Sequence, residues 1–95
     1  MARYVSLLRF TPQGVKNLKQ SPTRATAFCR VAENAGVQVE TQLWTTGAYD
    51  GILILNAASE VKALKAIARL AATGNVTTET LQAFDGKEFA TIVGR

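Results

Sequence analysis

Tyr49 and Asp50 stand side by side between Gly47 and Gly51 and are the residues of this sequence best suited to chemistry. A carboxylate beside a phenol could abstract a proton from a substrate while the phenol donates a hydrogen bond. An aspartate at the start of a strand, however, is more often bonded to backbone amides in a turn. We therefore favour a structural role for Asp50 and keep catalysis, with Asp50 as base and Tyr49 as donor, as the alternative.

Other groups that commonly support catalysis are missing. The sequence has no histidine, so the usual general base and the usual metal or haem ligand are absent. Cys29 is alone and occupies an apolar helical position without a histidine to activate it, so we expect it to be a core residue. Neither a P-loop nor a dinucleotide fingerprint is present. We therefore expect no cofactor and no metal.

The segment KNLKQSPTR is a candidate anion site. A helix that begins at its serine and proline would have free amides, and Lys16, Lys19 or Arg24 could supply positive charge. Trp44 and Tyr49 could stack on a planar ligand, although aromatic residues at this spacing more often lie in an interface or a core. The candidate ligand-binding residues are therefore Lys19, Arg24, Trp44, Tyr49 and Asp50.

Length, composition and charge limit the possible classes of protein. The chain has 95 residues with 47% hydrophobic content, which predicts one domain over residues 1–95. No segment has a signal-peptide core or about 20 apolar residues in a row, so we expect a cytoplasmic protein without a membrane partner. The net charge of +4 is scattered along the chain rather than gathered in basic runs. We therefore expect no nucleic-acid partner.

Hydrophobic periodicity and turn residues predict six main elements. The prolines after Thr11 and Ser21 fit helix starts, and Gly36 and Gly74 fit helix ends. Glycine at position 47 suits a two-residue hairpin turn, and the chain after Asp85 is expected to be a tail. The expected elements are a strand over 3–10, a short helical or turn segment over 11–20, a helix over 21–36, strands over 37–46 and 50–56, a helix over 59–73 and a strand from residue 75.

The order βαββαβ predicts an α+β, ferredoxin-like fold. Right-handed crossovers place both helices on one face of a four-stranded antiparallel sheet. The first and third strands are then central, and the second face of the sheet is open in a monomer. What covers the open face therefore bears on function.

Side-chain alternation in the hairpin sorts residues onto the two faces when Thr46 is paired with Tyr49. We expect one set to lie under the helices: Val37, Val39, Leu43, Ile52 and Ile54. We expect the other set on the open face: Glu40, Gln42, Trp44, Tyr49, Leu53 and Leu55. Gly51 would leave room there for the Trp44 indole.

Exposed leucines and an indole on an open face are typical of an interface. A small domain also has much to gain from burying a face against another copy. We therefore expect a homodimer, or an assembly of dimers, with Trp44, Leu53 and Leu55 in the interface.

Three segments in matching order, KNLKQSPTR, GAYD and GNVTTETLQAF, resemble the GYD-domain family over nearly the whole chain. The resemblance implies a ferredoxin-like domain of the dimeric α/β-barrel type, in which two open sheet faces pack together. It implies no reaction, because the family has no established one.

Two classes of function follow. The first is a self-associating module that binds a small apolar or aromatic ligand at or near the interface between the sheets. The second is a cofactor-independent oxygenase, isomerase or decarboxylase that uses Asp50 and Tyr49. RNA binding on the open sheet is disfavoured, because residues 52–55 lack stacking aromatics.

Overall fold

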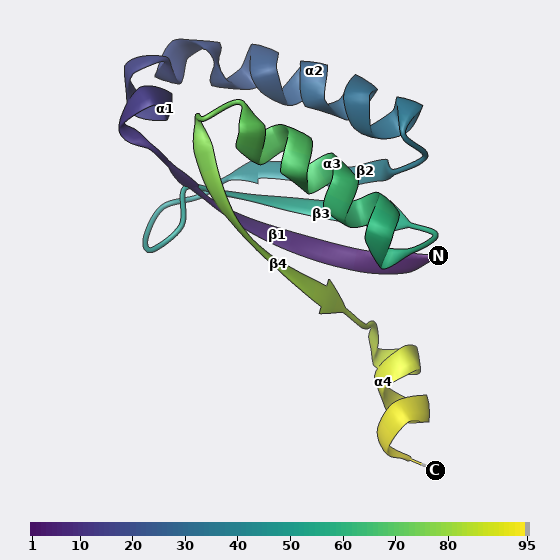
Figure 1. Ribbon diagram of the computed structural model, residues 1–95. Helices are drawn as coiled ribbons and strands as arrows, with labels where there is room; N and C mark the ends of the chain where they lie inside the picture. Colours follow the sequence, from purple (N-terminus) through teal and green to yellow (C-terminus); the bar gives the residue numbers. More distant parts are fainter. Residues whose placement is uncertain (95) are drawn as a thin grey trace.

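The computed structural model describes residues 1–94. Helical segments separate the first strand from the second and the third from the fourth, and the second and third strands follow one another directly (Figure 1). In chain order the elements are β1 (Ala2–Phe10), α1 (Pro12–Lys16), a 3-10 helix (Leu18–Gln20), α2 (Ser21–Asn34), β2 (Gln38–Trp44), β3 (Gly51–Ala57), α3 (Glu60–Ala72), β4 (Val76–Ala83) and α4 (Gly86–Val93).

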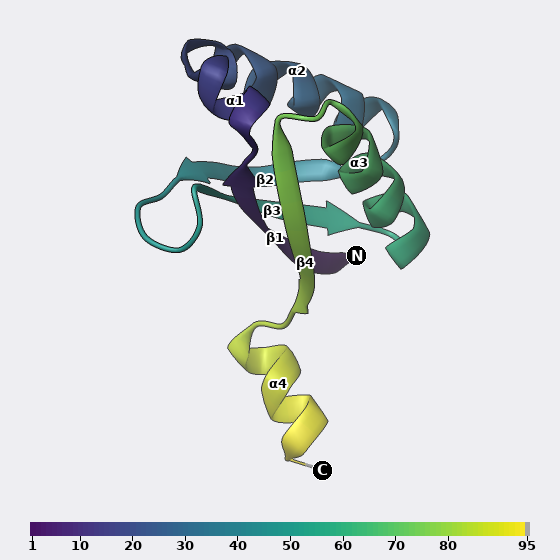
Figure 2. The same cartoon turned by 60° about the vertical axis from the view of Figure 1, so that its left-hand side comes forward.

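The four strands form one antiparallel sheet in the order β2-β3-β1-β4. Helices α2 and α3 lie together on one face of this sheet in both views (Figures 1 and 2). The predicted ferredoxin-like fold, with β1 and β3 central, is confirmed. We call the side of the sheet under α2 and α3 the helix face and the other side the open face.

Local signals in the sequence explain where the helices begin and end. Thr11 caps α1 with a side-chain oxygen that accepts from the Gly14 amide, and Ser59 caps α3 by accepting from the Lys62 amide. Gly36 and Gly74, which follow α2 and α3, have φ angles of 83° and 80°. Such left-handed conformations favour glycine, so both helices end where the sequence predicts.

The connection between β2 and β3 differs from the predicted two-residue turn. The strands pair only from Trp44 and Gly51 outward, and residues 45–50 form a longer loop. Its ends are joined by a hydrogen bond from the Thr45 amide to the Asp50 carbonyl. The predicted register of the hairpin beyond this loop is correct, since Leu43 lies opposite Ile52 and Gln42 opposite Leu53.

The prediction that Leu53 and Leu55 lie on the open face is wrong. Leu53 is 4% exposed and Leu55 is fully buried, and both belong to the core between the sheet and the helices with Phe28 and Ile67. Ile52 and Ile54 alternate with them and therefore lie on the open face. Alternation sorted these four side chains correctly into two sets, but the sets were assigned to the wrong faces.

A β-bulge at Glu40 explains why Val39 lies under the helices, as predicted, although the residues grouped with it on β3 do not. The pairing shifts between Val39 and Thr41, so Val39 lies opposite Leu55 and packs against the core. The extra residue, Glu40, places its carboxylate 3.5 Å from Arg3 Nε and accepts a hydrogen bond from Asn56 Nδ2. These contacts favour the ionised carboxylate and lower the pKa of Glu40. Val39 therefore does not share a face with Leu43.

The open face has an apolar centre that comes from all four strands. Leu43 on β2 is 54% exposed and Leu81 on β4 is 48% exposed, although both side chains are apolar. The strand register aligns these two residues with partly exposed aliphatic side chains of β1 and β3. This open-face patch consists of Val5, Leu7, Leu43, Ile52, Ile54 and Leu81.

The segment after Asp85 is a helix rather than the expected tail. Asp85 accepts a hydrogen bond from the Glu88 amide, and the Glu88 carboxylate accepts one from the Asp85 amide. This reciprocal capping box starts α4 and is visible in the sequence as Asp and Glu three residues apart. Figures 1 and 2 show α4 projecting away from the sheet, so its apolar residues Phe89, Ile92 and Val93 are exposed.

Candidate functional site

A cavity of about 320 Å³ lies on the helix face of the sheet. Its walls come from the end of β1, from α2, from the adjoining ends of β2 and β3, and from the chain between the end of α3 and the start of β4. The volume is at the lower end of the range for small-molecule sites. The cavity is therefore the first candidate for a binding site.

The greater part of the cavity wall is apolar. Aliphatic and aromatic side chains line it from the sheet and from both helices, and such a lining removes an apolar ligand from water. The apolar lining includes Leu8, Phe10, Phe28, Val31, Leu53, Leu70 and Val76. Phe28 and Leu53 also belong to the core, so the cavity continues from the core toward the surface.

Two polar side chains of the wall are already paired within the protein. Gln42 Nε2 donates to the Ala25 carbonyl at 2.9 Å. Trp44 Nε1 donates to Ser21 Oγ at 3.0 Å, which joins β2 to the start of α2. The Trp44 indole is half-exposed and lines the cavity, so the predicted ligand-binding role of Trp44 stays a prediction with a suitable position.

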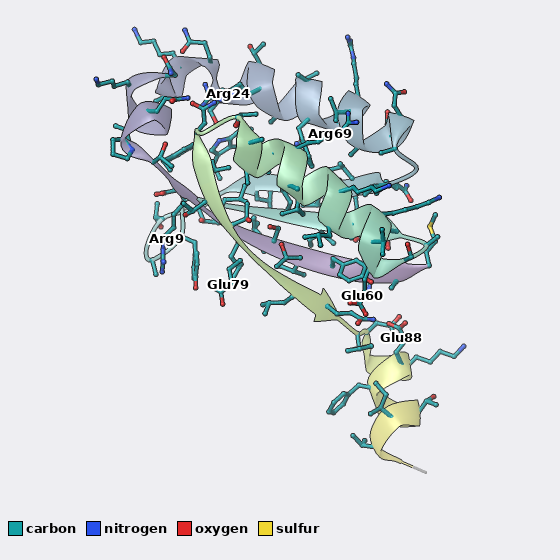
Figure 3. All side chains as sticks on the ribbon, viewed as in Figure 1. Arg9, Arg24, Glu60, Arg69, Glu79 and Glu88 are labelled. Atoms are coloured by element: carbon teal, nitrogen blue, oxygen red, sulfur yellow. The ribbon has the colours of Figure 1, made fainter. Side chains whose placement is uncertain are left out.

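Arg24 and Arg69 give the cavity positive charge. Figure 3 labels both, Arg24 near the start of α2 and Arg69 on α3. Arg24 Nη1 donates to the Asn17 carbonyl at 2.8 Å, whereas its buried Nη2 has no hydrogen-bond partner. Among residues 1–94, no carboxylate lies within 4.0 Å of either guanidinium group. A buried donor without a partner is costly, which marks the Arg24 end of the cavity as unsatisfied.

Asp50 also lines the cavity, but its carboxylate has a structural partner. Asp50 Oδ2 accepts a hydrogen bond from the Phe10 amide at 2.8 Å, and the Asp50 amide donates to the Leu8 carbonyl. These two bonds join the start of β3 to the end of β1. The geometry agrees with the structural role favoured for Asp50, although the acceptor serves an amide distant in sequence rather than a local turn.

Replacing Asp50 with alanine is expected to lower the free energy of unfolding by about 1 kcal/mol, because the Phe10 amide loses its acceptor. Asp50→Asn keeps a carbonyl oxygen and is expected to retain most of that stability. Urea unfolding of the two variants at neutral pH measures the difference. A clear stabilisation by Asn would instead indicate a carboxylate held for chemistry at a cost in stability.

Tyr49 lies outside the cavity, on the open-face side of the loop. Its hydroxyl donates to Glu79 Oε1 at 2.8 Å, and the Arg9 guanidinium lies 4.5 Å from the centre of its ring. Arg9 Nε also donates to the Ala48 carbonyl. The hydrogen bond to Glu79 raises the pKa of Tyr49. Tyr49 thus holds the loop against β1 and β4, and it does not line the cavity with Asp50.

The residues of the predicted anion site are only partly brought together. The 3-10 helix leads directly into α2, so the N-cap position falls on Gln20, which makes no side-chain cap, and Ser21 is the first helical residue. The Ser21 hydroxyl accepts from Trp44 Nε1. Lys16 and Lys19 are exposed on the segment before α2 and do not line the cavity. Of the predicted basic residues, Arg24 alone is part of the cavity wall.

Cys29 is partly buried between α2 and β2. Its thiol donates a weak hydrogen bond to Gln42 Oε1 at 3.5 Å. Burial, together with the nearby Glu33 carboxylate, raises the pKa of the Cys29 thiol and disfavours the thiolate. A packing role for Cys29 is consistent with this environment.

Arg69 and the apolar wall of the cavity were not identified from the sequence. Arg69 lies in the last turn of α3, where a basic residue also suits the helix dipole, so its type and position carried no separate signal. Among residues 1–94, no cluster of His, Cys, Asp and Glu could hold a metal ion. None of the described helices is long and apolar enough to span a membrane.

The fold and the site together define a small ferredoxin-like α+β domain with a cavity between its helices and its sheet. The chain belongs to the GYD domain family, whose model matches residues 4–93. The resemblance seen in the sequence is thereby confirmed. No curated protein and no solved structure is significantly similar to the chain.

Proposed function

We propose that this protein is a self-associating domain that binds a small, largely apolar ligand. The cavity on the helix face is the observation that supports ligand binding, because its wall is mostly apolar and Trp44 stands at its edge. The ligand we propose therefore lies under the helices of each protomer, rather than between two sheets as the sequence suggested.

Self-association is supported by the open-face patch. An isolated protomer would expose six aliphatic side chains in one area at the centre of its sheet. Packing two open faces together removes this surface from water, which suits a domain too small to build a large core of its own. The interface residues we propose are therefore those of the open-face patch, in place of Trp44, Leu53 and Leu55. Trp44 is replaced because its indole bonds to Ser21 of α2 and so belongs to the helix face.

Polar groups surround the open-face patch, as at many protein interfaces. Arg3, Glu40 and Asn56 form one connected group on one side. Arg9, Tyr49 and Glu79 form another beside the loop. In a two-fold symmetric dimer both copies use the same open face, and each edge group meets a different part of the partner's face. Because these groups contain charges of both signs, opposite charges can face each other across a sheet-to-sheet dimer.

Cofactor-independent catalysis is the second proposal and rests on the position of Asp50 at the cavity. Its carboxylate could meet a ligand there, but Oδ2 is occupied by the Phe10 amide and Tyr49 bonds to Glu79 instead. The pairing of Asp50 as base with Tyr49 as donor therefore receives no support from their positions. Binding remains the function that the geometry supports best.

Val31→Phe tests whether the cavity is the ligand site. Val31 lines the cavity from α2, so a larger side chain is expected to fill part of it and weaken binding of a neutral apolar probe such as 1-octanol by about tenfold, the loss of roughly 1.4 kcal/mol. Fluorescence of Trp44, the one tryptophan of the chain, reports on the titration.

The matched control is Val61→Phe, because Val61 is exposed on α3 and does not line the cavity. It is expected to bind the probe as the wild type does. A wild-type protein that does not bind 1-octanol, or equal binding by both variants, would contradict the proposed site.

A further inference from the structure

We infer that the ligand of the cavity is a monocarboxylate with an apolar body, whose carboxylate binds Arg24 and Arg69. This inference rests on the proposed function, since it concerns the same cavity. It adds the chemical class of the ligand and the end of the cavity at which its charged group lies.

Several polar side chains of the cavity wall already make hydrogen bonds within the protein. Gln42 and Trp44 use their donors on Ala25 and Ser21, and Asp50 accepts from the Phe10 amide. In contrast, the buried Nη2 of Arg24 has no partner. Among the residues of the wall, Arg24 therefore carries a buried donor that lacks a partner.

A planar guanidinium group is suited to an oxyanion. Its parallel N–H groups match the two oxygens of a carboxylate, and hydrogen bonds between charged partners are stronger than neutral ones. Arg69, an exposed residue of α3, lines the same cavity and can supply a second positive charge to an anion at Arg24. The apolar wall then accommodates the rest of the ligand.

The charge of the cavity distinguishes a carboxylate from a phosphate. Arg24, Arg69 and Asp50 are the ionisable side chains of the wall, and two cations with one carboxylate leave one positive charge. A monocarboxylate neutralises that charge. A phosphate monoester, with close to two negative charges at neutral pH, would leave an excess negative charge beside Asp50.

The test compares octanoate, 1-octanol and octyl phosphate in titrations of the full-length protein followed by Trp44 fluorescence. Octanoate is expected to bind about tenfold more tightly than 1-octanol, because its carboxylate makes charge-assisted contacts with the arginines that the alcohol cannot make. Arg69→Gln, which removes one cation without removing a hydrogen bond of the fold, is expected to weaken octanoate binding several-fold and leave 1-octanol binding unchanged. Arg24→Gln is expected to abolish the preference for octanoate.

Arg30→Gln is the matched control, because Arg30 is exposed on α2 and does not line the cavity. It is expected to bind all three probes as the wild type does. Since Arg24 also bonds to Asn17, each variant is first checked for an unchanged unfolding midpoint, and Arg69→Gln decides if Arg24→Gln is unstable.

The outcomes separate this inference from the proposed function. Equal affinities for octanoate and 1-octanol that neither arginine variant changes would overturn the inference while the cavity remains a binding site. Tighter binding of octyl phosphate than of octanoate would overturn the choice of carboxylate. Failure of all three probes to bind would contradict the proposed function itself.

Discussion

The Leu53→Glu variant is expected to be unfolded, or nearly so, at 25 °C. Leu53 is 4% exposed and packs in the core between the sheet and the helices, where a carboxylate finds no cationic partner among the described core residues. Burying such a charge, or protonating it to avoid the charge, costs several kcal/mol, and the lost leucine contacts add to that cost. Total stabilities of about 5–15 kcal/mol leave little margin for this loss.

Circular dichroism and urea unfolding measure this effect. Leu64→Glu is the matched control, since Leu64 lies on α3 with its side chain exposed, and the same substitution there is expected to change stability by less than about 1 kcal/mol. A folded Leu53→Glu protein with an unfolding midpoint close to that of the wild type would show that Leu53 is not a core residue in solution.

The core position of Leu53 also shows the limit of alternation as a guide to a sheet. Residues 52–55 read Ile-Leu-Ile-Leu, so both faces of β3 are equally apolar and the pattern cannot say which face the helices cover. The neighbouring strands contain the missing information. On β1, Tyr4 and Ser6 are buried while Arg3 and Arg9 share the opposite face, which identifies the helix face.

The order of the elements from β1 to β4 was predictable because the helix boundaries have local causes. Thr11 and Ser59 cap helices with their own side chains, and Gly36 and Gly74 end them with left-handed backbone conformations. The bulge at Glu40 was not predictable in the same way. It depends on contacts with Arg3 and Asn56, which lie on other strands.

The candidate site was predictable in its parts but not in its arrangement. Arg24, Trp44 and Asp50 were chosen from the sequence for their chemistry, and all three line the cavity. Tyr49, adjacent to Asp50 in sequence, belongs to another group because its hydroxyl bonds to Glu79 on β4. Arg69 comes from α3, and only the packing of α3 over the sheet places it across the cavity.

Replacing Ile54 with glutamate is expected to leave the protomer folded and to separate the proposed dimer. Ile54 lies on the open face of a central strand, within the open-face patch and away from the core under the helices. In a two-fold symmetric dimer both copies would bring a carboxylate into the same apolar interface. The desolvation of these charges costs several kcal/mol, so the dissociation constant is expected to rise by about three orders of magnitude, the equivalent of roughly 4 kcal/mol.

Light scattering and sedimentation across a range of protein concentrations measure the oligomeric state, and circular dichroism checks the fold of each sample. The control is Val61→Glu, because Val61 is exposed on α3 at the helix side of the molecule. It is expected to dimerise as the wild type does.

Dimers of Ile54→Glu as stable as those of the wild type would place the interface elsewhere, and α4, with Phe89, Ile92 and Val93 exposed, would then be the next surface to mutate. If instead Ile54→Glu is monomeric and folded while Leu53→Glu is unfolded, two adjacent residues of one strand will have separated association from folding, as their opposite faces require.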